Sequence, residues 1–356
     1  MTTINLAIFG IGNVGSTLIN QIQKLKHKLK HEQQLDIQIP VIANSTLAFF
    51  ADNTGENWQV DFEKFSVPYK IIDIIKYFKS VNAKNTIAID ATASTEFVDN
   101  YVPLIENGFH IVSANKVANT LSHQFYINLR KVLKKNDKKF LYETNVGAGL
   151  PIIETTKNLH QSGENITKIR GVFSGSLSYI FNRYSEEDIP FNEILSKASE
   201  KGLTEPDPRD DLSGKDVARK LLILARELGV KTELNQVKIE SLVPKQLNGQ
   251  TSLKQFKARS YELNSIFENN KKTQKPKTVL RYVGELDTVN NLLEVKLISE
   301  SKASALGQLK GADTLFEFYT DAYNTQPMII QGAGAGKAVT ARGVLSDILK
   351  LSTQLY

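Results

Sequence analysis

Short apolar runs alternate with longer amphipathic segments in the first part of the chain. Five runs are typical of buried strands, at residues 4–9, 37–43, 86–91, 110–113 and 140–142. Between the first two runs, apolar residues recur at helical spacing from Val14 to Leu29. Strands that alternate with helices predict an α/β fold, with a doubly wound parallel sheet that helices cover on both faces.

The pattern changes after Pro151, where strands and helices mix. Residues 166–173, 279–286 and 292–299 alternate as half-exposed strands do, whereas 191–201 and 212–228 have helical periodicity. A last helix, at about 338–355, follows a glycine-rich turn and is expected to return to the first domain. We therefore expect three parts: a first domain over 1–148, a mixed α+β domain over 149–318, and a C-terminal segment over 319–356.

A glycine pattern, G-x-G-x-x-G, joins the first strand to the first helix through Gly10, Gly12 and Gly15. The first glycine permits the tight turn, the second lets a pyrophosphate approach, and the third lets the helix pack on the strand. The N–H groups that open the helix, at Asn13 and Val14, suit phosphate oxygens. We therefore predict a Rossmann-type domain that binds a dinucleotide at these five residues.

The other strands end in polar turns that add to this predicted site. Ligands of such sheets bind beyond the carboxyl ends of the strands. The turns and the glycine-rich segment before the last helix contribute these candidates: Asn44, Thr92, Ala93, Ser94, Lys116 and Gly336. No acid stands at the end of the second strand to bind a ribose 2′-hydroxyl, the next one being Asp52, and no arginine is near. We expect NADP, with NAD as the open alternative.

Composition narrows the classes of chemistry. The chain has no cysteine, which excludes disulfides, thiolate metal sites and dehydrogenases that form a thioester. No Tyr-x-x-x-Lys motif occurs, and no histidine has an obvious acid partner or a zinc-like spacing. The net charge is +6, but the lysine clusters contain no interleaved aromatics, so we expect no nucleic-acid partner. No apolar run is long enough for a membrane, and the first residues lack a basic leader, which predicts a mature cytoplasmic protein.

Charged residues are concentrated between positions 202 and 220, where nineteen residues include nine charged ones. Prolines keep the first part out of a helix, which we expect to begin near Leu212 or Ser213. Asp216 and Lys220 then lie one turn apart on one face. Two interpretations stay open at this point. The segment is either a capped surface helix with an ion pair, or a carboxylate-rich loop for an ammonium substrate with a lysine for proton transfer.

This segment resembles the signature of homoserine dehydrogenases, especially the dehydrogenase half of bifunctional aspartokinase–homoserine dehydrogenases. Further segments match that family in the same order: SANK at 113–116, ETNVGAGLPII at 143–153, FSGSLSYIFN at 173–182, LRYVGEL at 280–286 and GAGAGKAVTARGVLSDI at 332–348. The resemblance covers essentially the whole chain. These residues include neither a kinase half nor a C-terminal ACT domain, so we expect a single-function form without a separate effector site.

The resemblance implies an enzyme that reduces aspartate 4-semialdehyde to homoserine in threonine and methionine biosynthesis, acting as a homodimer on a small-molecule substrate. Lys220, Lys116 and Asp216 would carry catalysis, with Lys220 the main candidate for proton transfer. Glu205 and Asp211 would hold the substrate ammonium, and Gly175 would let the backbone approach the substrate. A sodium-like cation would be held mainly by backbone carbonyls of these residues: Glu143, Val146, Ala148 and Leu150. Where many relatives have Tyr, this chain has Leu203.

Two rival functions remain at this point. One is a dehydrogenase for a different amino-acid semialdehyde, which would share the fold and the cofactor. The other is a redox-sensing regulator that binds a dinucleotide without turnover. A regulator needs a nucleic-acid-binding element, and no helix-turn-helix with a basic recognition helix is apparent in the sequence.

Overall fold

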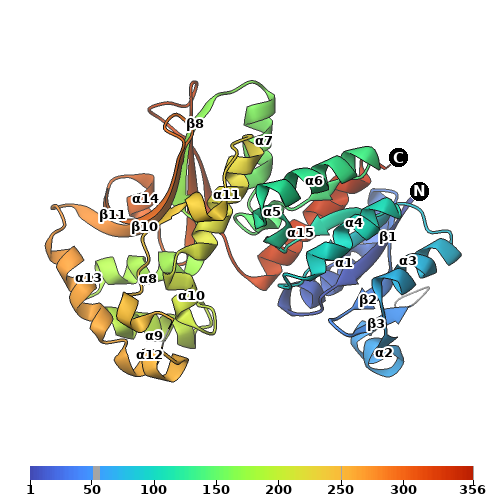
Figure 1. Ribbon diagram of the computed structural model, residues 1–356, viewed down its shortest axis with the longest axis horizontal. Coiled ribbons are helices and arrows are strands. Elements are labelled where there is room, and N and C mark those ends of the chain that lie inside the picture. The colour runs from blue at the N-terminus through green and yellow to red at the C-terminus, as the bar shows by residue number, and fades with distance from the viewer. Residues whose placement is uncertain (51–56, 250, 356) are drawn as a thin grey trace. The chain divides into compact units, whose positions relative to one another are not determined.

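The computed structural model describes residues 1–50, 57–249 and 251–355. The chain forms two compact units, one of Met1–Gly149 with Gly336–Tyr356 and one of Leu150–Ala335 (Figure 1). We expected the chain to leave the second domain at 319, but it does so only at Gly336. The reason is that residues 313–333 supply two paired strands to the sheet of the second unit. Asp52, considered above for cofactor choice, lies outside the described residues.

The first unit contains a seven-stranded sheet of order β4-β3-β2-β1-β5-β6-β7. The five strands predicted from apolar runs pair in parallel: β1 (Thr2–Phe9), β2 (Leu35–Ala43), β5 (Thr86–Asp90), β6 (His110–Ser113) and β7 (Phe140–Leu141). Two strands that we did not predict, β3 (Leu47–Phe50) and β4 (Val67–Pro68), add an antiparallel edge. They are too short to show a period. Strand order reverses between β1 and β5, which places a ligand crevice at their carboxyl ends.

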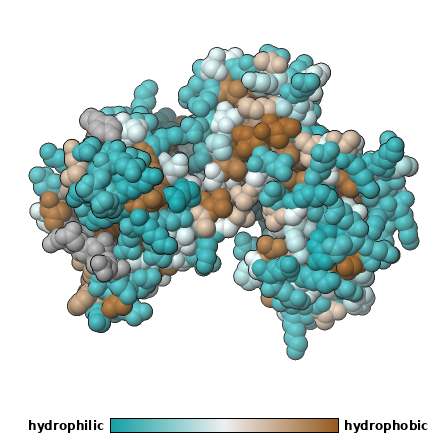
Figure 2. Space-filling model, turned by 180° about the vertical axis from the view of Figure 1, so that it is seen from behind, coloured by the Kyte–Doolittle hydropathy of each residue, from teal (hydrophilic) through white to brown (hydrophobic). Residues whose placement is uncertain are grey.

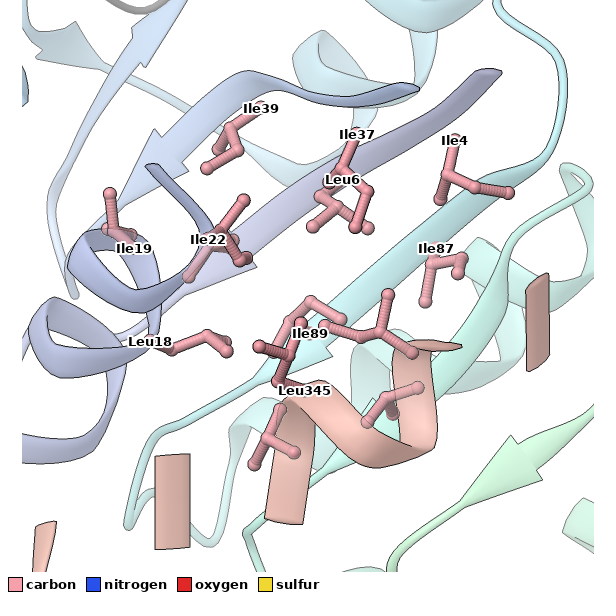
Figure 3. Close-up of a cluster of buried hydrophobic side chains, with 14 of the residues drawn as sticks. Ile4, Leu6, Leu18, Ile19, Ile22, Ile37, Ile39, Ile87, Ile89 and Leu345 are labelled. Atoms are coloured by element: carbon pink, nitrogen blue, oxygen red, sulfur yellow. The ribbon is translucent and has the colours of Figure 1, made fainter. Parts of the chain in front are cut away.

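Helices cover this sheet, and the last one comes from the end of the chain. They are α1 (Asn13–Glu32), α2 (Trp58–Phe65), α3 (Ile71–Ser80), α4 (Tyr101–Glu106), α5 (Val117–Thr120), α6 (His123–Lys135) and α15 (Lys337–Ser352), with 3-10 turns at Phe97–Asn100 and Glu143–Asn145. Figure 3 shows Leu345 of α15 beside Leu18 and Ile89 in one apolar cluster. Helix α15 therefore completes the apolar core of the first unit.

The second unit contains a six-stranded sheet of order β13-β12-β8-β10-β11-β9. Its strands are β8 (Ile166–Val172), β9 (Lys238–Ile239), β10 (Thr278–Asp287), β11 (Leu292–Ser301), β12 (Asp313–Thr320) and β13 (Met328–Ala333). Every pairing is antiparallel except that of β11 with β9. This mixed sheet agrees with the predicted α+β class.

The helices of the second unit include two that frame the charged segment. They are α7 (Ile152–Gln161), α8 (Gly175–Glu186), α9 (Phe191–Glu200), α10 (Pro208–Leu212), α11 (Lys215–Glu227), α12 (Leu253–Arg259), α13 (Glu262–Lys272) and α14 (Ala305–Gln308), with 3-10 turns at Leu234–Gln236 and Lys245–Leu247. Our predicted helix start at Leu212 or Ser213 was wrong. Leu212 ends α10, and Gly214, with a φ of 72°, separates it from α11. A Cβ on Gly214 would lie 2.1 Å from the Tyr282 hydroxyl, so glycine is needed there.

No helix within the described ranges is both long and apolar enough to cross a bilayer. On the face of the molecule shown in Figure 2, hydrophilic residues predominate and apolar residues gather in separate patches.

Candidate dinucleotide and substrate sites

The glycine turn has the geometry that close phosphate binding requires. Gly10 has a φ of 92°, and a Cβ there would lie 2.8 Å from the Ala91 carbonyl oxygen. A Cβ on Gly15 would lie 1.8 Å from the Gly10 carbonyl oxygen, so this glycine lets α1 pack on the turn. A Cβ on Gly12 would meet no atom within 4 Å, so the turn is open there. Gly12 caps α1 without a side chain, and the first N–H groups of the helix, at Asn13, Val14 and Gly15, have no acceptor inside the helix.

A cavity of about 700 Å³ lies over this turn. It brings together six of the predicted cofactor residues: Gly10, Gly12, Asn44, Thr92, Ala93 and Ser94. Asn13, Val14 and Gly15 form the adjoining first turn of α1, while Lys116 and Gly336 do not line the cavity. Lys116 stands at the start of α5, and Gly336, with a φ of 115°, at the start of α15.

The end of β2 borders this cavity with polar, uncharged groups. Asn44 Oδ1 accepts N–H bonds from Thr46 and Leu47, which closes the turn, and the Tyr69 hydroxyl donates to the Asn44 carbonyl at 3.0 Å. The neighbouring Lys70 also lines the cavity. Sequence reasoning missed Lys70, because it lies 26 positions after Asn44 and belongs to no motif.

A second cavity, of about 420 Å³, lies within the second unit over the charged segment. Its lining brings together three predicted site residues, Glu205, Asp211 and Asp216, whereas Gly175 and Lys220 do not line it. The other polar residues that line it are Ser174, Asp210, Ser213, Lys215 and Arg219. Four carboxylates thus face the cavity beside two cations, which suits a small zwitterionic molecule that carries an ammonium group.

Lys220 is buried, with 8% of its surface exposed. Its Nζ donates to the Phe173 carbonyl at 2.7 Å and lies 2.9 Å from Asp216 Oδ2. The predicted placement of Asp216 and Lys220 one turn apart is confirmed, and within this pair the Lys220 side chain is 10% exposed and the Asp216 side chain 39%. A buried ammonium held by a carboxylate at the edge of a polar cavity is suited to proton transfer.

Asp211 is an anchor for the loop that carries Glu205. Its Oδ1 accepts a 2.6 Å hydrogen bond from the Ser176 hydroxyl, and its Oδ2 accepts the Glu205 N–H at 2.8 Å. Burial raises the pKa of Asp211 above its usual range, and these two hydrogen bonds partly offset the rise. Ser176, at the start of α8, was missed by sequence reasoning, because a contact over 35 positions leaves no local signal.

A second anchor fixes the same loop further along. Asp207 caps α10 and accepts hydrogen bonds from the Arg209 side chain, which also donates to the Thr251 carbonyl at 2.7 Å. The Arg209 guanidinium lies 5.2 Å from the centre of the Phe256 ring. The segment between Glu205 and Asp211 is therefore held at both ends.

The predicted cation ligands lie along a glycine-rich turn. Glu143 begins a 3-10 turn, and its backbone N–H donates to Oδ2 of Asp347 in α15 at 2.9 Å. Further along the turn, Ala148 has a φ of 52°. Helix α15 lies close to this turn, because a Cβ on Gly343 would be 3.0 Å from the Ala148 carbonyl oxygen. Leu150 begins the second unit. In the part of the chain that the structure describes, no group of three or more Asp, Glu or His side chains could hold a metal ion.

The parallel sheet with its glycine turn, together with a mixed α+β unit that has a carboxylate-lined cavity, defines a two-domain protein of the dinucleotide-binding α/β class. Family models identify which one. A model described as "Homoserine dehydrogenase, NAD binding domain" matches residues 10–143, and one described as "Homoserine dehydrogenase" matches residues 151–349. The chain belongs to the homoserine dehydrogenase family, which confirms the resemblance seen in the sequence.

Relatives of known sequence agree with this assignment. A bifunctional aspartokinase/homoserine dehydrogenase of Buchnera aphidicola is 42% identical over 98% of this chain and 43% of its own length. A homoserine dehydrogenase of Schizosaccharomyces pombe is 35% identical over 99% of this chain and 96% of its own length. The chain thus spans about two fifths of the bifunctional relatives that it matches.

Solved structures confirm the fold class. A Candida auris protein of unknown function is 32% identical, with a TM-score of 0.91 over 100% of this chain and 99% of its own. A putative homoserine dehydrogenase from Archaeoglobus fulgidus is 23% identical, with a TM-score of 0.78 over 98% of this chain and 99% of its own. A hyperthermophilic archaeal homoserine dehydrogenase solved with NADPH is 20% identical, with a TM-score of 0.75 over 100% of this chain and 99% of its own.

Proposed function

We propose that this chain catalyses the NAD(P)H-dependent reduction of aspartate 4-semialdehyde to homoserine. Its membership of the homoserine dehydrogenase family supports the reaction class. The observation that carries the proposal is Lys220, a buried lysine whose ion-pair partner Asp216 lines the same cavity as Glu205 and Asp211. That arrangement supplies a proton donor and a group of carboxylates for an amino-acid substrate.

In this proposal each residue of the second unit has one task. Glu205, with Asp211 as its anchor, binds the substrate ammonium by charge-assisted hydrogen bonds. Gly175 lets the start of α8 approach the backbone just before β12, since a Cβ there would lie 2.9 Å from the Ala312 carbonyl oxygen. Asp216 orients Lys220, which gives a proton to the substrate oxygen.

The first unit supplies the cofactor and a second lysine. When bound, the dinucleotide supplies the hydride that the aldehyde carbon accepts. The first turn of α1 and Gly12 hold its phosphates, and Lys116 serves as the second catalytic lysine. NADP is the preferred form, because Lys70 lines the cavity together with Asn44 and offers a positive charge to a 2′-phosphate. Among the described residues that line the cavity, Glu96 is the one acid that could repel such a phosphate. NAD is the alternative.

A monovalent cation, a homodimer and a cytoplasmic location complete the proposal. The carbonyls of Glu143 and Leu150 accept N–H bonds from Val146 and Ile152, and backbone carbonyl oxygens are ligands that suit a hard cation. For the homodimer we point to Ile329, which is 44% exposed on the edge strand β13. Size-exclusion chromatography with light scattering tests the dimer, and activity measured in sodium, potassium and a bulky organic cation tests the ion.

NADPH consumption with aspartate 4-semialdehyde tests the activity. We expect turnover with this aldehyde, and a Lys220→Ala variant that binds NADPH but turns over poorly serves as the control for contaminating activity. Reduction of a different amino-acid semialdehyde in preference to this one would instead identify a related dehydrogenase. Tight dinucleotide binding without reduction of any aldehyde would favour the regulator.

A further inference from the structure

A buried carboxylate without a counter-ion lies beneath the dinucleotide cavity. Asp90 ends β5, has 1% of its surface exposed and immediately precedes the turn Thr92–Ser94 that lines the cavity. Among the described residues, the groups that act on its charge are the hydrogen-bond donors Thr92, Tyr101 and Asn115, and none of them is a Lys, Arg or His. A charge in such a position is costly unless another charge balances it.

Hydrogen bonds from three groups offset part of the cost of burying the Asp90 carboxylate. Oδ1 accepts the Thr92 N–H at 2.8 Å, and Oδ2 accepts the Tyr101 hydroxyl at 2.7 Å and the Asn115 amide at 3.1 Å. The Thr92 N–H and the Asn115 amide NH₂ can only donate, so these two partners favour the carboxylate over the protonated carboxyl. Burial raises the pKa of Asp90, and the hydrogen bonds from Thr92, Tyr101 and Asn115 lower it.

The fold places Asp90 on one particular side of the cavity. The cavity extends from Asn44 and Lys70, beside the end of β2, across the glycine turn to Thr92 and Ser94 after β5. In folds of this type the adenine ribose lies at the end of the second strand, with the pyrophosphate on the glycine turn. The nicotinamide half then lies on the β5 side, next to the turn that Asp90 holds.

We propose that Asp90 discriminates between the two redox forms of the cofactor, favouring the oxidised nicotinamide, whose ring carries a positive charge. This inference rests on the dinucleotide assignment made in the proposed function. The ring charge of the oxidised form balances the carboxylate, whereas the reduced ring is neutral and gains nothing from it. Because charges shielded from water interact strongly, the resulting difference between the affinities for NADP⁺ and NADPH should be measurable.

Asp90 acts here through its charge and not only through its hydrogen bonds. Its partner Asn115 also donates to the Ser94 carbonyl at 2.8 Å and accepts the Val117 N–H at 3.0 Å, so it links the cavity turn to the start of α5. Loss of these hydrogen bonds would disturb both redox forms alike. Loss of the Asp90 charge, in contrast, should change the affinity for one redox form more than for the other. The two forms carry the same phosphates and differ in charge only at the nicotinamide ring.

The test compares dissociation constants for NADP⁺ and NADPH at pH 8, by calorimetry for the first and by NADPH fluorescence for the second. For Asp90→Asn we expect NADP⁺ to bind about tenfold more weakly, which corresponds to a change of about 1.4 kcal/mol in charge interaction, and NADPH to change less than about threefold. Asp90→Ser removes the charge in a different way and serves if the Asn variant does not fold. Either variant should shift the ratio in the same direction.

Two variants keep the charge at Asp90 and control for structural damage. Tyr101→Phe removes one donor but leaves the carboxylate, so the NADP⁺ to NADPH ratio should stay within about twofold. Asp36→Asn alters another buried aspartate of the same sheet, 8% exposed and hydrogen-bonded to Gln38, and should leave the ratio unchanged. An unchanged ratio in the Asp90 variants, or an equal shift in Tyr101→Phe, overturns the inference. A wild-type chain that binds neither form contradicts the proposed function instead.

Discussion

The Ser176 hydroxyl donates a 2.6 Å hydrogen bond to Oδ1 of Asp211, and this contact joins the start of α8 to the loop that carries Glu205. Because Ser176 is 6% exposed, water cannot readily replace it as a donor. The carboxylate therefore has one fixed orientation, and through the Glu205 N–H it fixes the backbone of the substrate loop as well.

Replacing Ser176 with Ala should raise KM for homoserine roughly tenfold, since a hydrogen bond to a charged group contributes about 1.5–3 kcal/mol. KM for the cofactor should not change, because the contact lies wholly within the second unit. Initial-rate kinetics with each substrate varied in turn measures both constants. Ser178→Ala, a buried serine of the same helix, is the matched control. Equal KM values for homoserine in the two variants would contradict the role of Ser176.

Lys220→Ala should lower kcat by about 100-fold or more, within the usual range for a general acid or base. Dinucleotide affinity should hardly change, because the cofactor cavity belongs to the first unit. Steady-state rates and NADPH fluorescence titration give the two quantities. Lys231→Ala, an exposed lysine beyond the end of α11, should behave as wild type. Near wild-type turnover of the Lys220 variant would remove this lysine from the mechanism.

Glu205→Gln should raise KM for homoserine by roughly tenfold and leave KM for the cofactor unaltered, because an amide binds an ammonium less well than a carboxylate does. The same kinetic series on Asp211→Asn should show a similar direction with an added loss of thermal stability, since Asp211 also anchors the loop. A fall in cofactor affinity in either variant would show that these residues serve a different site.

Lys70→Ala should weaken NADPH binding about tenfold and NADH binding little, because only NADPH has a 2′-phosphate for the ammonium to bind. Fluorescence titration with both reduced cofactors measures the two effects. Lys76→Ala, an exposed lysine on α3, controls for a general loss of positive charge. If both cofactors lost affinity equally, Lys70 would contact the shared part of the dinucleotide.

His110 should make the fold sensitive to acid. Burial, followed by the charge of Lys138, lowers the pKa of His110 to about 4, and its Nδ1 accepts the Lys139 N–H at 3.1 Å. The pKa of His110 is lower in the folded chain than in the unfolded chain, where it is near 6.5. The free energy of unfolding is therefore highest above pH 6.5 and falls by about 3 kcal/mol as the pH drops toward 4. Urea unfolding at pH 7.5 and 4.5 measures the loss. His110→Asn, which does not titrate there, should lose distinctly less, and equal losses would argue against His110.

The sequence predicted the elements that carry a long regular pattern, and it could not predict contacts between distant segments. The strand before Gly10 and the helix after it follow from apolar spacing and from the glycines, which are local signals. The break at Gly214 was missed because the reason for it, the Tyr282 hydroxyl, lies 68 positions away. Lys70 and Ser176 were missed for the same reason, since folding alone brings them to the cavities.

The order in which this chain leaves the ribosome differs from the order in which its units can be completed. The second unit is continuous in sequence, so all its strands are available once Ala335 has been made. The first unit begins the chain, yet its apolar core still lacks Leu345, Ile348 and Leu351 at that moment. Although nascent domains usually fold from the N-terminus onward, here the unit that starts first must wait for the last helix, with its apolar sheet exposed meanwhile.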